Sequence, residues 1–251
     1  MFSPYLDEKD RFMEFYFIVF AIILFAAVIQ GAAGFGFGLV AVSLLSMFVN
    51  IKDASLILLL SGIALNLFIF SRLYKEFCFD QIIPIFISSL VCVPIGVYIL
   101  EKADCSVLKY MLGVILILMV IQRLTPALKE HKWHPYWLGI PCGICTGILA
   151  GSLGAAGPPV VAFVASQKFK KFHYSACVQF IFVNCCFFRL LFVLEKGLMT
   201  KQILITGAVG VLFVIIGAFI GLKIMKKMSE KILGYIITAM LFSFGIKYLF
   251  L

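Results

Sequence analysis

The stretch GAAGFGFGLV (residues 31–40) places four glycines within eight residues of a strongly apolar sequence. A second stretch, GSLGAAGPPV (residues 151–160), lies 120 residues further on. Glycine has no side chain to restrict its backbone and proline has no N–H, so both residue types interrupt helices. The two stretches therefore predict two broken helices at corresponding places in the chain.

The composition around these stretches is typical of a membrane protein. Of the 251 residues, 63% are hydrophobic and 13% are charged, and the mean hydropathy is +1.13; soluble domains have about 25% charged residues. Charge-free runs of spanning length recur along the chain, and each predicts a transmembrane helix. We expect an all-α polytopic membrane protein. The net charge of +9 is assigned to basic loops between spans rather than to a nucleic-acid partner.

The charged residues divide the chain into two similar halves. Residues 15–51 form a charge-free run, and residues 133–167 form a second run without Lys, Arg, Asp or Glu. Each run has a glycine-rich stretch near its middle and is followed by three plain apolar runs, an arrangement common in transporters. We predict a first repeat at 12–123, a connecting cytoplasmic loop at 124–136 and a second repeat at 137–251. Each long run is either two short full-length helices or a re-entrant pair, which gives eight to ten membrane segments.

Basic residues indicate the orientation. The loops at 72–80, 123–136, 167–172 and 223–231 share one expected face and carry 12 Lys or Arg residues, against eight on the other face. The more basic face should be cytoplasmic. Both termini are then expected outside, and the second repeat is inverted relative to the first.

The broken helices are the predicted binding site. Irregular backbone at membrane depth is tolerated where it lines a polar cavity, and a helix that restarts there presents unpaired N–H groups and a positive dipole end. Two such ends facing one another suit an anion. Close helix packing through G-x-x-x-G contacts is the alternative explanation for the glycines. The candidate substrate-binding residues at the two stretches are Gln30, Gly31, Gly34, Phe35, Gly36, Gly38, Ser152, Gly154, Ala155, Ala156 and Gly157.

Arg189 is the one basic residue well inside an apolar run. A charge at such depth is costly and indicates function, although snorkelling to the interface or pairing with Glu195 would also explain it. Gln179 and Asn184 complete the candidate set, and Asn66 is a further polar residue inside a span.

Other kinds of chemistry find little support in the sequence. No Asp or Glu lies in the middle of a span, which argues against a carboxylate relay or a cation substrate. Cys142 and Cys145 form a C-x-x-C without a second pair or a thioredoxin-like setting, so the cysteines are interpreted as small apolar residues. We expect no metal, no cofactor and no enzymatic activity.

Two motifs carry a resemblance to a known family. QGAAGFGFG (residues 30–38), AGSLGAAGPP (residues 150–159) and the arrangement in two halves resemble the TauE/SafE family of sulfite and organosulfonate exporters, over about residues 15–250. Phe35 and Phe37 interleave the glycines of the first motif, and no proline follows soon after, which departs from the usual pattern. The resemblance implies a secondary carrier in a prokaryotic inner membrane. Its substrate would be a small sulfur-containing anion such as sulfite, thiosulfate or a sulfonate.

We therefore expect an anion exporter that works by alternating access, with the anion held at the midplane between the two breaks. A passive anion channel, a non-transporting scaffold and a membrane-embedded enzyme are the alternatives. The sequence leaves the exact substrate, the direction of transport, the coupling ion and the oligomeric state open.

Overall fold

The computed structural model describes residues 8–124, 135–167, 169–227 and 230–250, and all of its regular elements in these ranges are helices. Most of the expected connecting loop at 124–136 lies outside the described residues, as does Lys168 in an expected cytoplasmic loop. The all-α prediction is confirmed.

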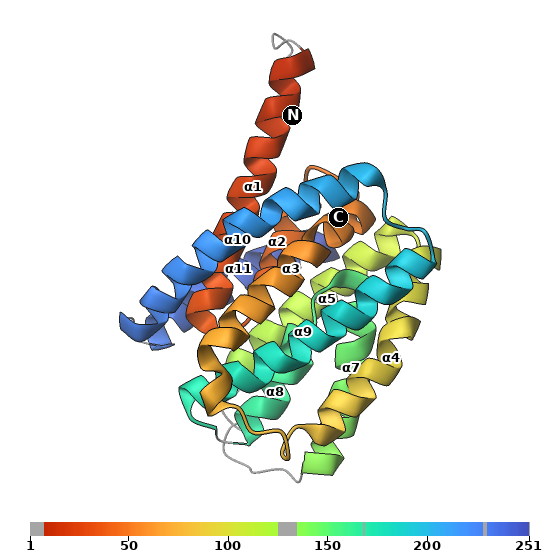
Figure 1. The fold of residues 1–251 in the computed structure, drawn as a ribbon. Coiled ribbons are helices and arrows are strands. Elements are labelled where there is room, and N and C mark those ends of the chain that lie inside the picture. Colours follow the sequence, from red (N-terminus) through yellow and green to blue (C-terminus); the bar gives the residue numbers. More distant parts are fainter. Residues whose placement is uncertain (1–7, 125–134, 168, 228–229, 251) are drawn as a thin grey trace.

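The first half of the chain contains a broken helix followed by three long ones (Figure 1). A short 3-10 turn, Tyr74–Glu76, links the third and fourth helices. The elements are α1 (Glu8–Ala33), α2 (Phe37–Leu45), α3 (Ile51–Leu73), α4 (Ile83–Lys102) and α5 (Cys105–Leu124).

The second half repeats this order of elements. Its helices are α7 (Pro135–Leu153), α8 (Gly157–Ser166), α9 (Lys171–Glu195), α10 (Lys201–Lys227) and α11 (Glu230–Leu249). A break of three residues separates α7 from α8, and the same number separates α1 from α2. The described order of helices is therefore the same in both halves.

Seven helices of the described part are long and apolar enough to cross a bilayer. They lie in α1, α3, α4, α5, α7, α9 and α10. The helices α2 and α8 have 9 and 10 residues. At about 1.5 Å per residue each reaches only about half of a hydrocarbon core about 30 Å thick. Each broken segment is thus a full-length helix followed by a half-length one, and neither is a pair of full spans.

The helix pairings connect the two halves. The helix α1 packs along α10, α4 packs along α7, α3 lies against α9 and α5 lies against α11. In the repeat, α1 corresponds to α7, α3 to α9, α4 to α10 and α5 to α11. Replacing each helix by its counterpart turns the pair α1·α10 into α7·α4, and it leaves the pairs α3·α9 and α5·α11 unchanged. This is the contact pattern that a two-fold repeat produces.

Small residues make the pairs α1·α10 and α4·α7 close. A Cβ on Gly31 would lie 2.9 Å from the Ala218 carbonyl oxygen and 3.0 Å from the Cα of Gly221. At the corresponding place, a Cβ on Gly151 would lie 2.3 Å from the Val93 carbonyl oxygen. Both glycines therefore serve backbone-to-backbone packing, the role that G-x-x-x-G contacts have in membranes.

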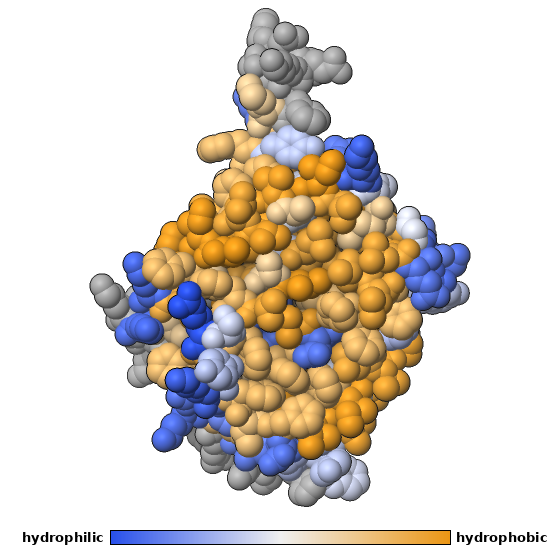
Figure 2. Space-filling model, in the orientation of Figure 1, coloured by the Kyte–Doolittle hydropathy of each residue, from blue (hydrophilic) through white to orange (hydrophobic). Residues whose placement is uncertain are grey.

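The face of the molecule drawn in Figure 2 is mainly apolar. Large side chains such as Phe17, Val91 and Leu212 are exposed, and in Figure 2 most of the hydrophilic groups lie along the margins of an orange face. Such a surface would be unstable in water and suits lipid contact. The protein is a multi-pass membrane protein.

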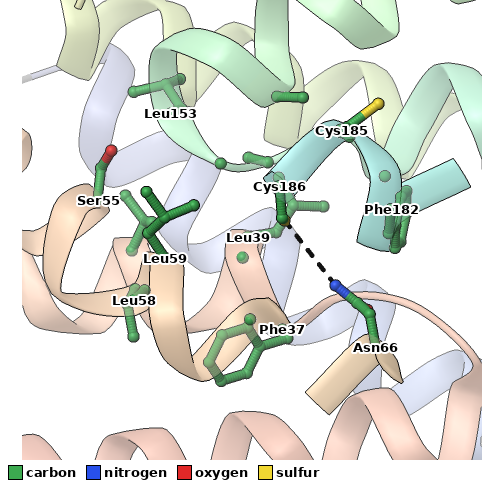
Figure 3. Close-up of a pocket in the computed structure, with 18 of the residues that line it drawn as sticks. Phe37, Leu39, Ser55, Leu58, Leu59, Asn66, Leu153, Phe182, Cys185 and Cys186 are labelled. Atoms are coloured by element: carbon green, nitrogen blue, oxygen red, sulfur yellow. Dashed lines mark hydrogen bonds between the residues drawn. The ribbon is translucent and has the colours of Figure 1, made fainter. Parts of the chain in front are cut away.

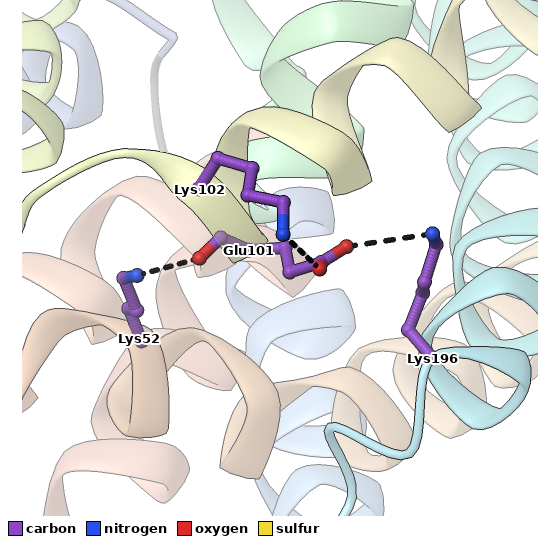
Figure 4. A network of polar contacts seen from close by, with 4 residues as sticks. All are labelled: Lys52, Glu101, Lys102 and Lys196. Atoms are coloured by element: carbon purple, nitrogen blue, oxygen red, sulfur yellow. Dashed lines mark hydrogen bonds and ion pairs between the residues drawn. The ribbon is translucent and has the colours of Figure 1, made fainter.

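One end of the bundle carries a charged network (Figure 4). The Glu101 carboxylate lies 2.9 Å from Lys102 Nζ and 3.5 Å from Lys196 Nζ, and Lys52 Nζ donates to the Glu101 carbonyl at 3.0 Å. The start of α3 and the ends of α4 and α9 therefore share one face. Lys52, Lys102 and Lys196 lie outside the four loops expected on the more basic face, and the structure groups them at one end of the bundle.

Candidate functional site

The two breaks are in direct contact. Gly34 and Gly36 have φ angles of 82° and 113°, and Gly154 has a φ angle of 68°, in the left-handed region that glycine enters without steric penalty. A Cβ on Gly38 would lie 2.1 Å from the Gly154 carbonyl oxygen. The absence of a side chain at Gly38 therefore lets the start of α2 pack directly onto the second break.

A cavity lies where the breaks meet (Figure 3). Its wall comes from both breaks and from the middle parts of α3 and α9. The cavity volume that the centre of a water molecule can occupy is ≈ 40 Å³. A site for a single water needs roughly 10–15 Å³ by the same measure. The space suits a few waters or one small solute. The polar and sulfur-containing side chains in its wall are Gln30, Ser55, Asn66, Cys185, Cys186 and Arg189.

Arg189, on α9, donates hydrogen bonds to carbonyl groups at the C-terminal end of α7. Its side chain is 1% exposed. Nε donates to the Gly151 carbonyl at 2.9 Å, and Nη2 donates to the Ser152 carbonyl at 3.3 Å. The Ser55 carbonyl accepts from Nη1 at 3.3 Å, and the Ser55 hydroxyl accepts from Nη2. The last carbonyls of a helix lack helical partners and carry a partial negative charge, so a cation is stabilised there.

The Arg189 guanidinium has one N–H group without an acceptor and a positive charge without a carboxylate partner among the described residues. A guanidinium has five N–H groups, and the four bonds above leave one N–H of Nη1 unused. Nη1 lies 2.6 Å from the place a Gly154 Cβ would take. Among the described residues, no carboxylate forms an ion pair with Arg189. The expected alternative of pairing with Glu195 therefore does not occur, and snorkelling does not fit its burial.

A cluster of three amides holds the first break in place. Gln30 Oε1 accepts from the Phe37 N–H at 2.9 Å, while Gln30 Nε2 donates to Gln179 Oε1 at 3.1 Å and to Asn66 Oδ1. Gln179 Nε2 donates to the Gly34 carbonyl at 2.7 Å. All three side chains are buried. The cluster satisfies one donor and one acceptor of the broken backbone, which would be costly if left unpaired in a membrane.

Backbone N–H groups remain available at the cavity wall. In the part of the chain that the structure describes, no intramolecular hydrogen bond uses the N–H of Gly36, Gly38 or Leu39 in the first break. The same holds for Ala156 and Gly157 in the second. The first turn of a helix lacks backbone acceptors for its N–H groups. Pro158 and Pro159 at the start of α8 have no N–H to offer, so the first break supplies more donors than the second.

The structure brings most of the predicted site residues together. Those that line the cavity are Gln30, Gly36, Gly38, Gly154, Ala155, Ala156, Gly157 and Arg189. Gln179 and Ser152 stand behind the wall, where they bind the Gly34 carbonyl and Arg189 respectively. Gly34 forms the turn before the wall.

Three predicted residues lie away from the cavity wall. Gly31 faces α10, and Phe35 is buried in the apolar core. Asn184 Nδ2 donates to the Phe180 carbonyl of its own helix at 2.8 Å. Gly31 therefore has a packing explanation, and Asn184 has an explanation in a hydrogen bond within its own helix; the sequence alone did not separate either from a binding role.

Residues of α3 and α9 at the wall were not among the candidates. Ser55 accepts hydrogen bonds from Arg189, Gly62 and Phe182 line the cavity, and Cys185 and Cys186 add thiols. Asn66 was noted only as a polar residue in a span, and the structure places it in the wall. Its position 120 residues before Cys186 is the same offset that relates the two glycine-rich stretches. That offset is the sequence signal that could have selected it.

A comparison with known protein families matches residues 19–248 to the family described as "Sulfite exporter TauE/SafE". A search of curated proteins and a search of solved structures each found no significant match. The family match covers both breaks, all the described cavity residues and most of the chain. The protein therefore belongs to the sulfite exporter TauE/SafE family of membrane transporters.

Proposed function

We propose that the protein is a secondary exporter of a small sulfur-containing anion, such as sulfite, thiosulfate or an organosulfonate. The anion would sit at the midplane of the membrane, in the cavity between the two breaks. Its oxygens would accept from the N–H groups of residues 36–39 and 156–157, with the Arg189 guanidinium as the nearby positive charge. Family membership supports the class of substrate.

The observation that carries this proposal is the buried, unpaired charge of Arg189. A buried cation is strongly destabilising unless it is paired and hydrogen-bonded. Carbonyl and hydroxyl oxygens accept four of its N–H groups, but no described carboxylate offsets its charge. An anion that enters the cavity would supply the missing counter-charge.

The arrangement of helices supports alternating access. The cavity wall joins parts of both halves, and discontinuous helices at the interface of two repeats are a recurring site in secondary transporters. Access would alternate if one half rocked against the other around the touching breaks. We also propose the inverted relation of the halves and the prokaryotic inner membrane as the location, with both termini outside.

Transport by purified protein in proteoliposomes tests the proposal. Labelled sulfite, thiosulfate and sulfoacetate are offered in turn, and the initial rate is measured against concentration. We expect saturable flux of at least one of these anions, with competition by the others. Liposomes without protein set the background. Flux that rises linearly without saturation would indicate a passive channel, and no flux of any anion would contradict a transport function.

A further inference from the structure

The orientation of the amide cluster is fixed by the backbone of the first break. The two ends of a side-chain amide differ in that the oxygen accepts hydrogen bonds and the nitrogen donates them, so the surrounding groups decide which way each amide points. Here the Phe37 N–H can only donate, so the atom of Gln30 that meets it at 2.9 Å must be the oxygen. Gln30 Nε2 must then donate, and the atoms it meets on Asn66 and Gln179 must be oxygens.

The same reasoning fixes the free end of each partner. Gln179 Nε2 meets the Gly34 carbonyl at 2.7 Å, an acceptor that confirms its orientation. Asn66 is left with its Nδ2 on the side away from Gln30. Nδ2 lies 3.9 Å from the Cys186 sulfur, which is a weak acceptor at long range. Figure 3 shows this nitrogen directed toward Cys186 across the cavity.

Asn66 is therefore a buried donor aimed into the cavity. Its side chain is 4% exposed, and it forms part of the wall. An NH₂ group has two N–H donors, and a buried donor without a good acceptor costs free energy. Such a group, held in one orientation by Gln30, has the features of a preorganised ligand contact.

The position of Asn66 strengthens this assignment. The cavity wall contains Asn66 of α3 and Cys186 of α9, which hold the same place in the two glycine-centred halves and meet in space. Only the first half supplies an amide at this place. Arg189 lies on the α9 side of the same cavity, so donors reach it from both halves.

We propose that Asn66 is a substrate-binding and specificity-determining residue, which donates its Nδ2 hydrogens to oxygens of the transported oxyanion. The inference rests on the proposed function. Two directed N–H groups suit the separated oxygens of a sulfite or sulfonate group better than a spherical halide. Asn66 therefore selects an oxyanion over chloride, while Arg189 supplies charge to either.

Two substitutions separate a binding role from a structural one. Asn66→Ala removes both the oxygen that Gln30 needs and the donor. Asn66→Asp keeps an oxygen for Gln30 and the size of the side chain, but it replaces the donor with a second oxygen. Asn50→Asp is the matched control on the same helix, because the Asn50 oxygen accepts from the Lys52 N–H and an Asp oxygen can do the same.

The measurement is sulfite flux into proteoliposomes at pH 8, with KM, maximal rate and inhibition by chloride determined for each protein. We expect Asn66→Ala to raise KM roughly tenfold or more, since a hydrogen bond to a charged group is lost. Chloride should inhibit this variant at lower concentration than it inhibits the wild type. Asn66→Asp should transport no better than Asn66→Ala, and Asn50→Asp should match the wild type.

The other possible results contradict either the binding role of Asn66 or the proposed function. Recovery of the wild-type KM by Asn66→Asp would show that Asn66 only supports Gln30, and would contradict the binding role. An unchanged KM and chloride inhibition in Asn66→Ala would contradict it as well, while the proposed function stands. Absence of saturable sulfite flux in the wild type would instead overturn the proposed function, and the inference with it. If Asn66→Ala does not fold, the comparison of Asn66→Asp with Asn50→Asp still decides.

Discussion

Single residues at the breaks have roles that differ from the one first suggested by their type. Gly38 and Gly154 are close enough that a side chain on Gly38 would collide with the Gly154 carbonyl oxygen, 2.1 Å from the added Cβ. The N–H of Gly154 is already used, because it donates to the Ala150 carbonyl at 3.1 Å. The absence of a side chain at Gly38 makes room for the backbone of the second break, and its absence at Gly154 makes room for Arg189. In the described part of the chain, the backbone N–H groups without an intramolecular acceptor at the breaks lie at Gly38 and at residues near these two glycines.

Gly154→Ala should abolish transport. The substitution forces alanine into a φ angle of 68° and brings its Cβ within 2.6 Å of Arg189 Nη1. The backbone strain alone costs about 1–3 kcal/mol, and the contact displaces the guanidinium. Thermal unfolding and sulfite flux are measured together. Gly197→Ala is the matched control, because Gly197 has a φ angle of 63° and nothing within 4 Å of an added Cβ. Equal flux in the two variants would contradict a role for Gly154 at the cavity.

At the scale of elements, a glycine-rich stretch combines a packing face with a break. Gly31 faces α10, whereas Gly36 and Gly38 line the cavity. From the sequence, helix packing and a binding site were alternative explanations for the glycines. In the structure, each explanation applies to different glycines of the same stretch. The half-length helices α2 and α8 follow from the same breaks, because each restarts within the bundle and ends after 9 or 10 residues.

Gly31→Ala should lower stability without changing substrate affinity. The new Cβ would lie 2.9 Å from a carbonyl oxygen of α10, and backbone atoms cannot move aside without separating the helices. Overpacking of this kind costs about 1–3 kcal/mol. We expect a lower unfolding temperature and an unchanged KM for sulfite in the protein that remains folded. A raised KM at unchanged stability would indicate that Gly31 contributes to the binding site after all.

The sequence predicted the broken elements better than the cavity wall. Glycine and proline act through the local backbone, so their recurrence at a fixed offset predicted both breaks. The partners of Arg189 could not be predicted, because Ser55 and Gly151 are 134 and 38 residues away in the chain. No periodicity in α3 marks the face that meets α9, so the offset of 120 residues from Cys186 was the sequence signal left to select Asn66. That Pro158 and Pro159 lack N–H groups was readable from the sequence.

At the scale of the whole molecule, helices of one half pack along helices of the other half, and we propose that transport uses this arrangement. The pairs α1·α10 and α4·α7 each join one helix from either half. The shared cavity lies between the halves, at the two breaks. In the alternating-access proposal, a movement of one half relative to the other opens the cavity to one side of the membrane and closes it to the other.

The predicted topology can be tested with reporter fusions. Alkaline phosphatase becomes active only outside the cytoplasm, whereas a fluorescent protein folds inside. We expect phosphatase activity for a fusion at the C-terminus and none for a fusion after Lys129, because the proposed orientation puts the basic loops in the cytoplasm. The fluorescent fusions should give the opposite pattern. A fluorescent C-terminal fusion without phosphatase activity would reverse the proposed orientation.

Exchange of labelled sulfite tests the central claim most directly. Proteoliposomes are loaded with unlabelled sulfite, and the uptake of external labelled sulfite is followed for the wild type, Arg189→Lys and Arg189→Met. We predict that internal sulfite accelerates uptake by the wild type, that Arg189→Lys retains a reduced rate, and that folded Arg189→Met shows none. Full exchange by Arg189→Met, or no acceleration in the wild type, would contradict a carrier that binds its anion at this cavity.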